Sequence, residues 1–247
     1  MRTHAVELPA PAIGGAGAVI RYGHWGRPVL MFPSEGGRAR DLADNGMVAA
    51  VADLIEAGRV KLYCVDSFDA GSWAARELPL EQRARRHEAY ESWLLDQVVP
   101  HIRADSGGAA EPIAAGCSMG AFHALNVALR HADVFPLALC LSGNYDPAAW
   151  HGWGERGTAA YVNNPTDYVP HLAGEHLDWL RGRLSVLLVC GQGQWEDTTG
   201  ALDSTRRMAG LLAAKGIRHE LDLWGHDVPH DWPSWRAQFA HHLPRFC

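Results

Sequence analysis

Gly116-Cys117-Ser118-Met119-Gly120 has the pattern G-x-S-x-G, with an apolar run before it and a helical pattern after it. In that context the pattern predicts a tight strand-to-helix turn that exposes the Ser118 hydroxyl in a cleft. Glycine is expected at both ends, because a side chain at either position would collide with the adjacent strand or helix. Ser118 is therefore a candidate nucleophile. The pentapeptide alone also fits a plain turn with a solvent-facing serine.

The composition indicates one globular domain over residues 1–247, since 47% of the residues are hydrophobic and 20% are charged. A net charge of −6 gives no basic surface for nucleic acid. No apolar stretch approaches the roughly 20 residues that span a bilayer, and the N-terminus lacks a signal-peptide pattern. We therefore expect a cytoplasmic protein with neither a nucleic-acid nor a membrane partner.

The cysteines and histidines show no ligand pattern. The chain has five widely spaced cysteines and 14 histidines, and none of them has the spacing of a zinc site. A G-x-G-x-x-G fingerprint and a P-loop pattern are also missing from the sequence. We therefore expect no disulfide framework, no metal site and no cofactor.

Strand-like apolar runs alternate with helical patterns along most of the chain. This order predicts an α/β fold with a mainly parallel central sheet and helices on both faces. Residues 1–16 are expected to form a loop or an edge strand, and Pro100 to kink or restart the long helix that contains it. The predicted strands are 18–22, 28–32, 60–65, 112–115, 136–141, 184–190 and 217–224; the predicted helices are 47–57, 80–104, 121–130, 202–215 and 235–243.

Residues 142–183 break this alternation and are predicted to be an irregular insertion rich in large aromatic side chains, including Trp150 and Trp153. Two interpretations stay open: the insertion is a lid over an active site, or it is a packed excursion that only covers the sheet. Under the first, Trp150 and Trp153 are candidate substrate contacts. A bulky or aromatic acyl group fits these tryptophans, and so does ordinary core packing.

Acidic and histidine side chains follow the later predicted strands. Glu196 and Asp197 come after the strand 184–190, and His226 and His230 come after the strand 217–224. Together with Ser118 they give the chain order serine, acid, histidine of the α/β-hydrolases. A histidine would take the serine proton, and the acid would fix the tautomer of that histidine.

The chain resembles the esterase branch of the α/β-hydrolases, which includes S-formylglutathione hydrolases, enterochelin-type esterases, feruloyl esterases and mycolyltransferases. The resemblance covers about residues 18–243. Its most specific pieces are the turn at Ser118 and residues 230–236, which are similar to the branch's His-x-Trp-x-x-Trp pattern. It implies the α/β-hydrolase fold, with Ser118 as nucleophile, His230 as base and Glu196 as acid. Asp197 is the alternative acid.

Glu35-Gly36-Gly37-Arg38 resembles the loop that supplies one oxyanion amide in that branch. The resemblance implies that the amides of Gly37 and Met119 hold the oxyanion. Glu35 and Arg38 would then lie beside the substrate. His226 would be a neighbour of the site, in contact with the base or with the substrate.

The sequence thus predicts a serine esterase that cleaves a small-molecule carboxylic ester or thioester through an acyl-enzyme. Two alternatives remain, an acyltransferase with an alcohol or amine acceptor and a non-catalytic binding protein on the same fold. The chain shows no signal peptide, unlike the secreted mycolyltransferases, so mycolyl transfer is not inferred. The acyl group, the alcohol group and the oligomeric state stay open, and a homo-oligomer is compatible with the sequence.

Overall fold

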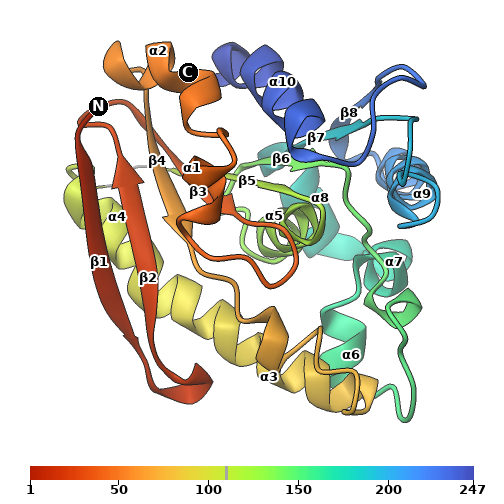
Figure 1. Cartoon of the computed structure of the whole chain (residues 1–247). Coiled ribbons are helices and arrows are strands. Elements are labelled where there is room, and N and C mark those ends of the chain that lie inside the picture. Colours follow the sequence, from red (N-terminus) through yellow and green to blue (C-terminus); the bar gives the residue numbers. More distant parts are fainter. Residues whose placement is uncertain (109–110) are drawn as a thin grey trace.

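The computed structural model describes residues 1–108 and 111–247, and within them eight strands form one sheet in the order β1-β2-β4-β3-β5-β6-β7-β8 (Figure 1). Strands β1, β2 and β4 pair antiparallel, and all pairs from β4 to β8 are parallel. The predicted α/β class with a mainly parallel sheet is therefore confirmed. The strands are β1 (Thr3–Ala10), β2 (Gly15–Tyr22), β3 (Arg27–Phe32), β4 (Val60–Val65), β5 (Ile113–Cys117), β6 (Leu137–Leu141), β7 (Ser185–Cys190) and β8 (Arg218–Leu223).

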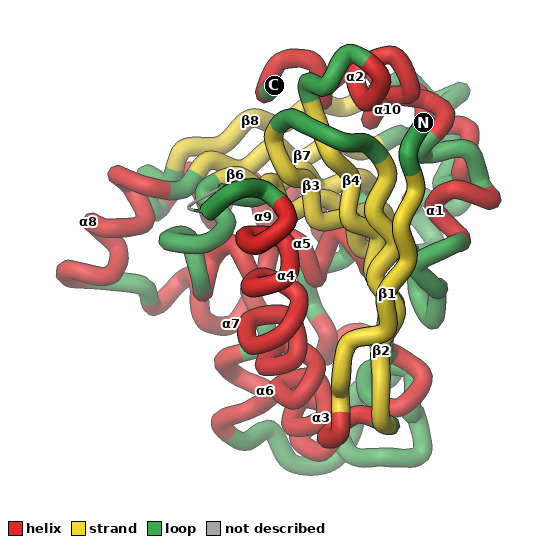
Figure 2. Tube along the Cα trace, turned by 90° about the vertical axis from the view of Figure 1, so that its left-hand side faces the viewer, coloured by secondary structure: helices red, strands yellow, loops and turns green. Residues whose placement is uncertain are grey.

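Helices cover both faces of the sheet (Figures 1 and 2). One core cluster packs α3 (Leu80–Trp93), α4 (Val99–Asp105), α5 (Met119–Arg130), α8 (Gly174–Arg183) and α9 (Ala201–Ala214) on one face. The other packs α1 (Asp41–Asp44), α2 (Ala52–Glu56) and α10 (Trp232–His242) on the opposite face. Alternate side chains of β3 belong to the two clusters, because successive side chains of a strand point to opposite faces of the sheet. Short 3-10 turns are η1 (Pro11–Ile13), η2 (Ala49–Val51), η3 (Asp69–Gly71), η5 (Pro147–Ala149), η6 (Val169–His171) and η7 (Leu243–Phe246).

The first residues of the chain form an edge strand, one of the two outcomes expected for 1–16. Strand β1 pairs with β2 along its whole length, and the two make a long hairpin that extends beyond the rest of the sheet (Figure 2). The turn at its tip, η1, packs against α3. The hairpin therefore closes one edge of the molecule beside the long helix.

The long helix restarts near Pro100, as predicted. Between α3 and α4 lies a π-helical turn, η4 (Leu94–Val98), and Pro100 stands in the first turn of α4. Proline has no N–H to donate, and its ring clashes with the carbonyl four residues earlier in an α-helix. The wider π turn accommodates both effects, so the helix continues with a local change of pitch.

The prediction that 142–183 is irregular is wrong in part, because the segment contains α6 (Thr158–Val162), α7 (Pro165–Tyr168) and α8. Its residues look like turn formers in the sequence, yet some of them start helices. Asn164 caps α7 by accepting the amide hydrogen of Thr166 at 3.0 Å, with Pro165 at the first helical position. Helices α6 and α7 are also too short to show a clear period.

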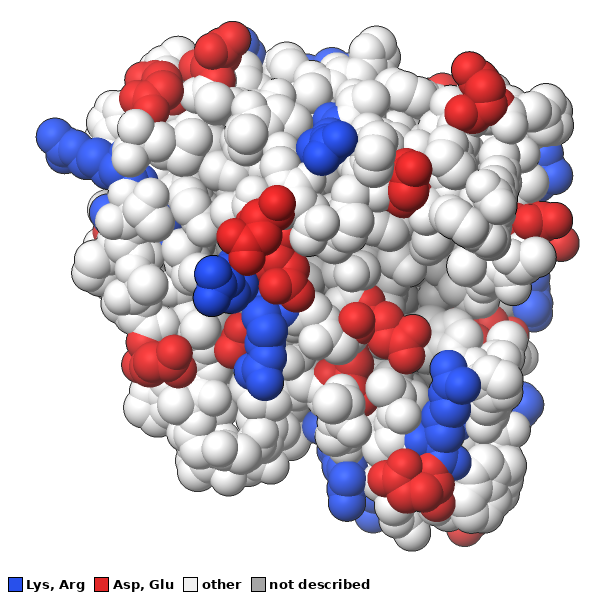
Figure 3. Space-filling view, viewed as in Figure 1, with Lys and Arg blue, Asp and Glu red and all other residues white. Residues whose placement is uncertain are grey.

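Charged side chains of both signs are interspersed over the face of the molecule seen in Figure 3. Among the described residues, no helix is long and apolar enough to cross a membrane.

Candidate active site

Ser118 stands in a strained turn between β5 and α5, with φ 56° and ψ −122°. Positive φ is uncommon outside glycine and marks a position that the surrounding structure enforces. The flanking glycines are required sterically: a Cβ at Gly116 would lie 2.3 Å from the Gly120 carbonyl oxygen, and one at Gly120 would lie 2.3 Å from that of Pro33. The predicted collision at both glycines is confirmed.

Gly116→Ala is therefore expected to lower the free energy of unfolding by about 2–3 kcal/mol, because the new methyl group meets rigid backbone. Urea unfolding followed by circular dichroism measures this. The matched control is Gly210→Ala in α9, where a Cβ meets nothing within 4 Å, and alanine there should stabilise the helix by about 0.5–1 kcal/mol. Equal unfolding midpoints for the two variants would contradict the steric argument.

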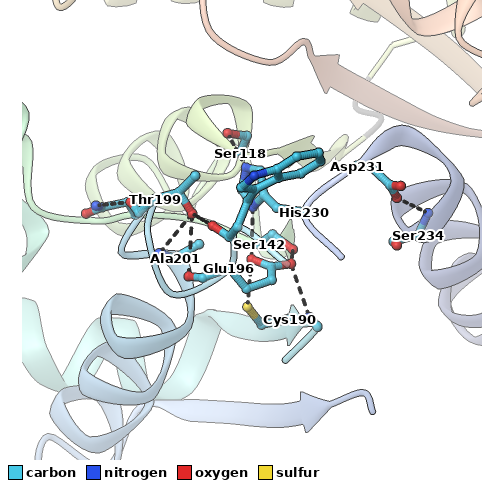
Figure 4. A network of polar contacts seen from close by, with 12 residues as sticks. Ser118, Ser142, Cys190, Glu196, Thr199, Ala201, His230, Asp231 and Ser234 are labelled. Carbon is cyan, nitrogen blue, oxygen red and sulfur yellow. Dashed lines mark hydrogen bonds and ion pairs between the residues drawn. The ribbon is translucent and has the colours of Figure 1, made fainter. Parts of the chain in front are cut away.

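Ser118, His230 and Glu196 form a continuous hydrogen-bonded chain (Figure 4). His230 Nε2 lies 3.0 Å from Ser118 Oγ, and His230 Nδ1 lies 2.9 Å from Glu196 Oε2. Glu196 is completely buried and the His230 side chain is 9% exposed. Because an ionised carboxylate only accepts, Nδ1 carries the hydrogen and Nε2 is free to accept the one from the serine. The arrangement can move a proton from the hydroxyl to the imidazole.

Asp197, the alternative acid, and His226, the other candidate histidine, lie outside this hydrogen-bonded chain. Asp197 is exposed, and its Oδ1 accepts the amide hydrogen of Thr198 at 2.8 Å. His226 is exposed and does not line the cavity beside Ser118. A backbone hydrogen bond favours the pairing of His230 with Glu196. The amide of His230 donates to the Gln194 carbonyl at 2.9 Å, so the loop that contains His230 is bonded to the loop that contains Glu196.

The tryptophans after His230 fix its ring. The His230 and Trp235 rings pack edge to face with centroids 4.9 Å apart, and Trp232 packs on Trp235 in the same way at 5.1 Å. Asp231 caps α10 by accepting the amide hydrogen of Ser234 at 2.9 Å. The His-x-Trp-x-x-Trp pattern is thus a helix start that holds the imidazole in place.

Glu196 has further partners that the sequence analysis did not identify. Ser142 donates its hydroxyl to Glu196 Oε1 at 2.5 Å, and the Gly191 amide donates to the same oxygen at 3.3 Å. The Cys190 thiol lies 3.4 Å from Oε2; burial, and then the nearby carboxylate, raise the pKa of this thiol, so it stays neutral. Ser142 directly follows β6 and has φ 51°. A serine directly after a predicted strand was the signal available in the sequence.

A cavity of about 410 Å³ opens at Ser118. Trp150 forms part of its wall and packs edge to face with Trp73 and Phe122, with centroids 5.8 and 4.9 Å apart. Of the predicted residues, Glu35, Met119 and Trp150 line it together with Ser118 and His230. The other lining residues come from loops without a recognisable motif: Trp73, Arg76, Ser142, Asn144, Ala149, His151, Thr198, Thr199 and Ala201.

Besides Glu196, Asp197 and His226, three further predicted site residues do not line this cavity. Trp153 is 51% exposed and donates its indole N–H to the Arg76 carbonyl at 3.0 Å. Arg38 lies beside a different cavity, with Nη1 3.5 Å from Asp66 Oδ2. The amide of Gly37 donates to the Ser34 carbonyl at 3.0 Å, so it is engaged within its own turn.

Comparisons with solved structures agree with this architecture. The chain is similar to a ferulic acid esterase (TM-score 0.74, 16% identity, covering 99% of this chain and 97% of that one). It is also similar to MPT51 of Mycobacterium tuberculosis (TM-score 0.73, 15% identity, 99% and 97%). A third similar structure is an S-formylglutathione hydrolase from Agrobacterium tumefaciens (TM-score 0.73, 14% identity, 98% and 93%). At these identities the likeness shows the shared α/β-hydrolase fold.

No curated protein matches the sequence closely enough to serve as a relative. The family model described as "Putative esterase" matches residues 31–246, which is most of the chain and includes Ser118, Glu196 and His230. The chain therefore belongs to the "Putative esterase" family, and with it to the carboxylic ester hydrolases of the α/β-hydrolase fold.

Proposed function

We propose that the protein is a serine esterase that cleaves a small-molecule carboxylic ester or thioester through an acyl-enzyme. The observation that carries this proposal is the hydrogen-bonded chain from Ser118 through His230 to the buried Glu196, at the mouth of a cavity. Such a chain supplies a nucleophile, a base and an orienting acid in one place.

In the first half of the proposed reaction, Ser118 Oγ attacks the carbonyl carbon while His230 Nε2 takes the hydroxyl proton. His230 then gives this proton to the leaving alcohol or thiol, and the serine ester is left. In the second half, water attacks the acyl carbon while His230 takes a proton from it, and His230 then returns this proton to Ser118 Oγ as the bond to the acid product breaks. Glu196 stays ionised and stabilises the imidazolium, and its three other donors hold it in place.

The oxyanion of the tetrahedral intermediate forms beside the N-terminus of α5, where the amide of Met119 is a proposed donor. The second donor comes from the loop over residues 33–38. The sequence pointed to Gly37, whose amide already has an acceptor within its turn. Glu35 lines the cavity, and its amide has no acceptor among the described residues. We therefore favour the amide of Glu35 as the second donor.

Labelling with a fluorophosphonate tests the nucleophile, because this reagent reacts with activated serines. We expect stoichiometric modification of Ser118 in the folded protein, located by peptide mass spectrometry. Chromogenic esters and thioesters of graded acyl length would then define the substrate, with added alcohol to detect transfer. Folded protein that neither reacts with the fluorophosphonate nor hydrolyses any ester would favour a non-catalytic binding protein, and an acyl ester product would favour a transferase.

Glu196→Gln is expected to reduce kcat/KM on the order of 10³-fold, because the amide no longer selects the productive tautomer of His230. Asp197→Asn is the matched control next to it, with an expected change of no more than about threefold. Both values come from ester hydrolysis rates on variants whose folding circular dichroism verifies. A large loss in Asp197→Asn with full activity in Glu196→Gln would exchange the two assignments.

A further inference from the structure

Another carboxylate–histidine pair, formed by Asp69 and His123, is buried in the molecule close to the active site. Asp69 and His123 are each 1% exposed, and His123 Nε2 lies 2.9 Å from Asp69 Oδ1. The other carboxylate oxygen, Oδ2, accepts the amide hydrogen of Gly36 at 3.1 Å. One carboxylate thus joins three segments: the loop after β3, the turn η3 after β4, and helix α5.

Two of these segments, helix α5 and the loop after β3, adjoin or contain residues of the proposed site. Helix α5 begins directly after Ser118 and carries His123 five residues later. Glu35 lies next to Gly36 and lines the cavity with Ser118. The bonds from Asp69 therefore tie the loop that contains Glu35 to the helix that carries the nucleophile.

The pair is held firmly. A buried carboxylate is costly unless donors surround it, and Asp69 has one donor from the loop and one from the helix. The His123 ring packs against His87 at 5.2 Å and Tyr90 at 5.4 Å, centroid to centroid, so aromatic rings restrict its orientation. His87 has no hydrogen-bond partner among the described residues, and it contributes packing alone.

We propose that Asp69 and His123 are positioning residues that fix the loop over residues 33–38, and with it the amide of Glu35, at the place where the oxyanion forms. The inference rests on the proposed esterase mechanism at the same site. Oxyanion donors work only within about 2.7–3.1 Å of the charge that develops. A loop that is free to shift would therefore reduce the stabilisation of the transition state more than it reduces substrate binding.

The main test is Asp69→Ala. We expect kcat to fall by about 10- to 100-fold while KM changes by no more than about threefold, because the loss is confined to the transition state. Inhibition by a trifluoromethyl ketone, whose serine adduct carries an oxyanion, should weaken by a similar factor. His123→Phe keeps a ring but removes the donor, and should shift kcat and inhibition in the same direction.

Asp69→Asn is the conservative variant. Its amide oxygen can accept from Gly36, and its amide nitrogen can donate to His123 once that histidine takes the other tautomer. We expect kcat within about fivefold of the wild type. A loss in Asp69→Asn equal to that in Asp69→Ala would contradict positioning by these hydrogen bonds.

Two controls separate positioning from general stability. His87→Phe alters the packing beside His123 without removing a hydrogen bond. Asp105→Asn disturbs the bond to the buried Lys61, 2.9 Å away in a cluster that contains no cavity-lining residue. Asp105→Asn is expected to lower the melting temperature, and both variants are expected to leave kcat unchanged. All assays use temperatures at which circular dichroism shows a folded variant; if Asp69→Ala does not fold, Asp69→Asn and His123→Phe carry the test.

The two proposals fail in different ways. A wild-type protein without labelling and without hydrolysis would refute the esterase mechanism itself. A wild-type enzyme that is active and labelled, with folded Asp69→Ala and His123→Phe variants that keep full kcat and full inhibitor affinity, would refute only the positioning role.

Discussion

Replacing Ser118 by alanine is expected to lower ester hydrolysis by about 10⁴-fold or more, because the variant cannot form the acyl-enzyme. The fold should survive. Ser118 lies at the end of β5, where its hydroxyl contacts His230 and the cavity and contributes little to the core. Initial rates with the best chromogenic ester, together with a fluorophosphonate labelling assay, measure the effect.

The control for Ser118→Ala is its free energy of unfolding, which should match that of the wild type to within about 1 kcal/mol. Alanine at φ 56° is no more strained than serine, so a difference beyond this is not expected. If a pure preparation of the variant kept most of its activity, the assignment of the nucleophile would have to be abandoned.

His230→Ala is expected to approach the defect of Ser118→Ala, again on the order of 10⁴-fold, because His230 is the side chain that hydrogen-bonds the Ser118 hydroxyl among the described residues. The comparison residue is His226, which shares the loop and also precedes an aspartate. It is exposed and outside the cavity lining, so His226→Ala should cost about 10-fold or less. Turnover and fluorophosphonate labelling of both variants provide the measurement.

Each histidine variant needs circular dichroism, because His230 packs on Trp235 and its removal leaves a gap there. His230→Phe, which refills that space, serves as a second inactive variant. An inactive, unlabelled His226→Ala beside a nearly wild-type His230→Ala would reverse the two roles.

Most strands could be predicted from the sequence because a parallel sheet buried on both faces uses nearly continuous apolar runs. Residues 60–65 illustrate this, since all six are buried and the predicted bounds equal those of β4. The segment 142–183 could not be predicted in the same way. Its helices α6 and α7 are only about one turn long; α6 follows Gly157, and α7 starts at Asn164 and Pro165, residue types that also mark loops.

Ser118, Glu196 and His230 could be selected as candidates from the sequence because each follows a predicted strand, and the structure joins the three by hydrogen bonds. The choice between Glu196 and Asp197 depends on which of the two side chains points into the protein. They are neighbours in an irregular loop, and such a loop has no hydrophobic periodicity from which the buried side chain could be predicted. The hydrogen bond from Ser142 to Glu196 could not be predicted for a related reason. It depends on β6 lying next to β7, and sheet order is a property of the tertiary structure.

The order of the strands has a consequence for engineering. Ser118, Ser142 and Glu196 follow β5, β6 and β7, three neighbours in the sheet. Adjacent strands lie about 4.8 Å apart, so the ends of β5 and β7 stand about two strand spacings from each other. Backbone hydrogen bonds set this spacing, and the loop after β7 then places the Glu196 carboxylate 2.9 Å from His230 Nδ1. Ala149 and His151, which line the cavity from the segment after β6, can therefore be substituted to change substrate preference while this spacing is kept.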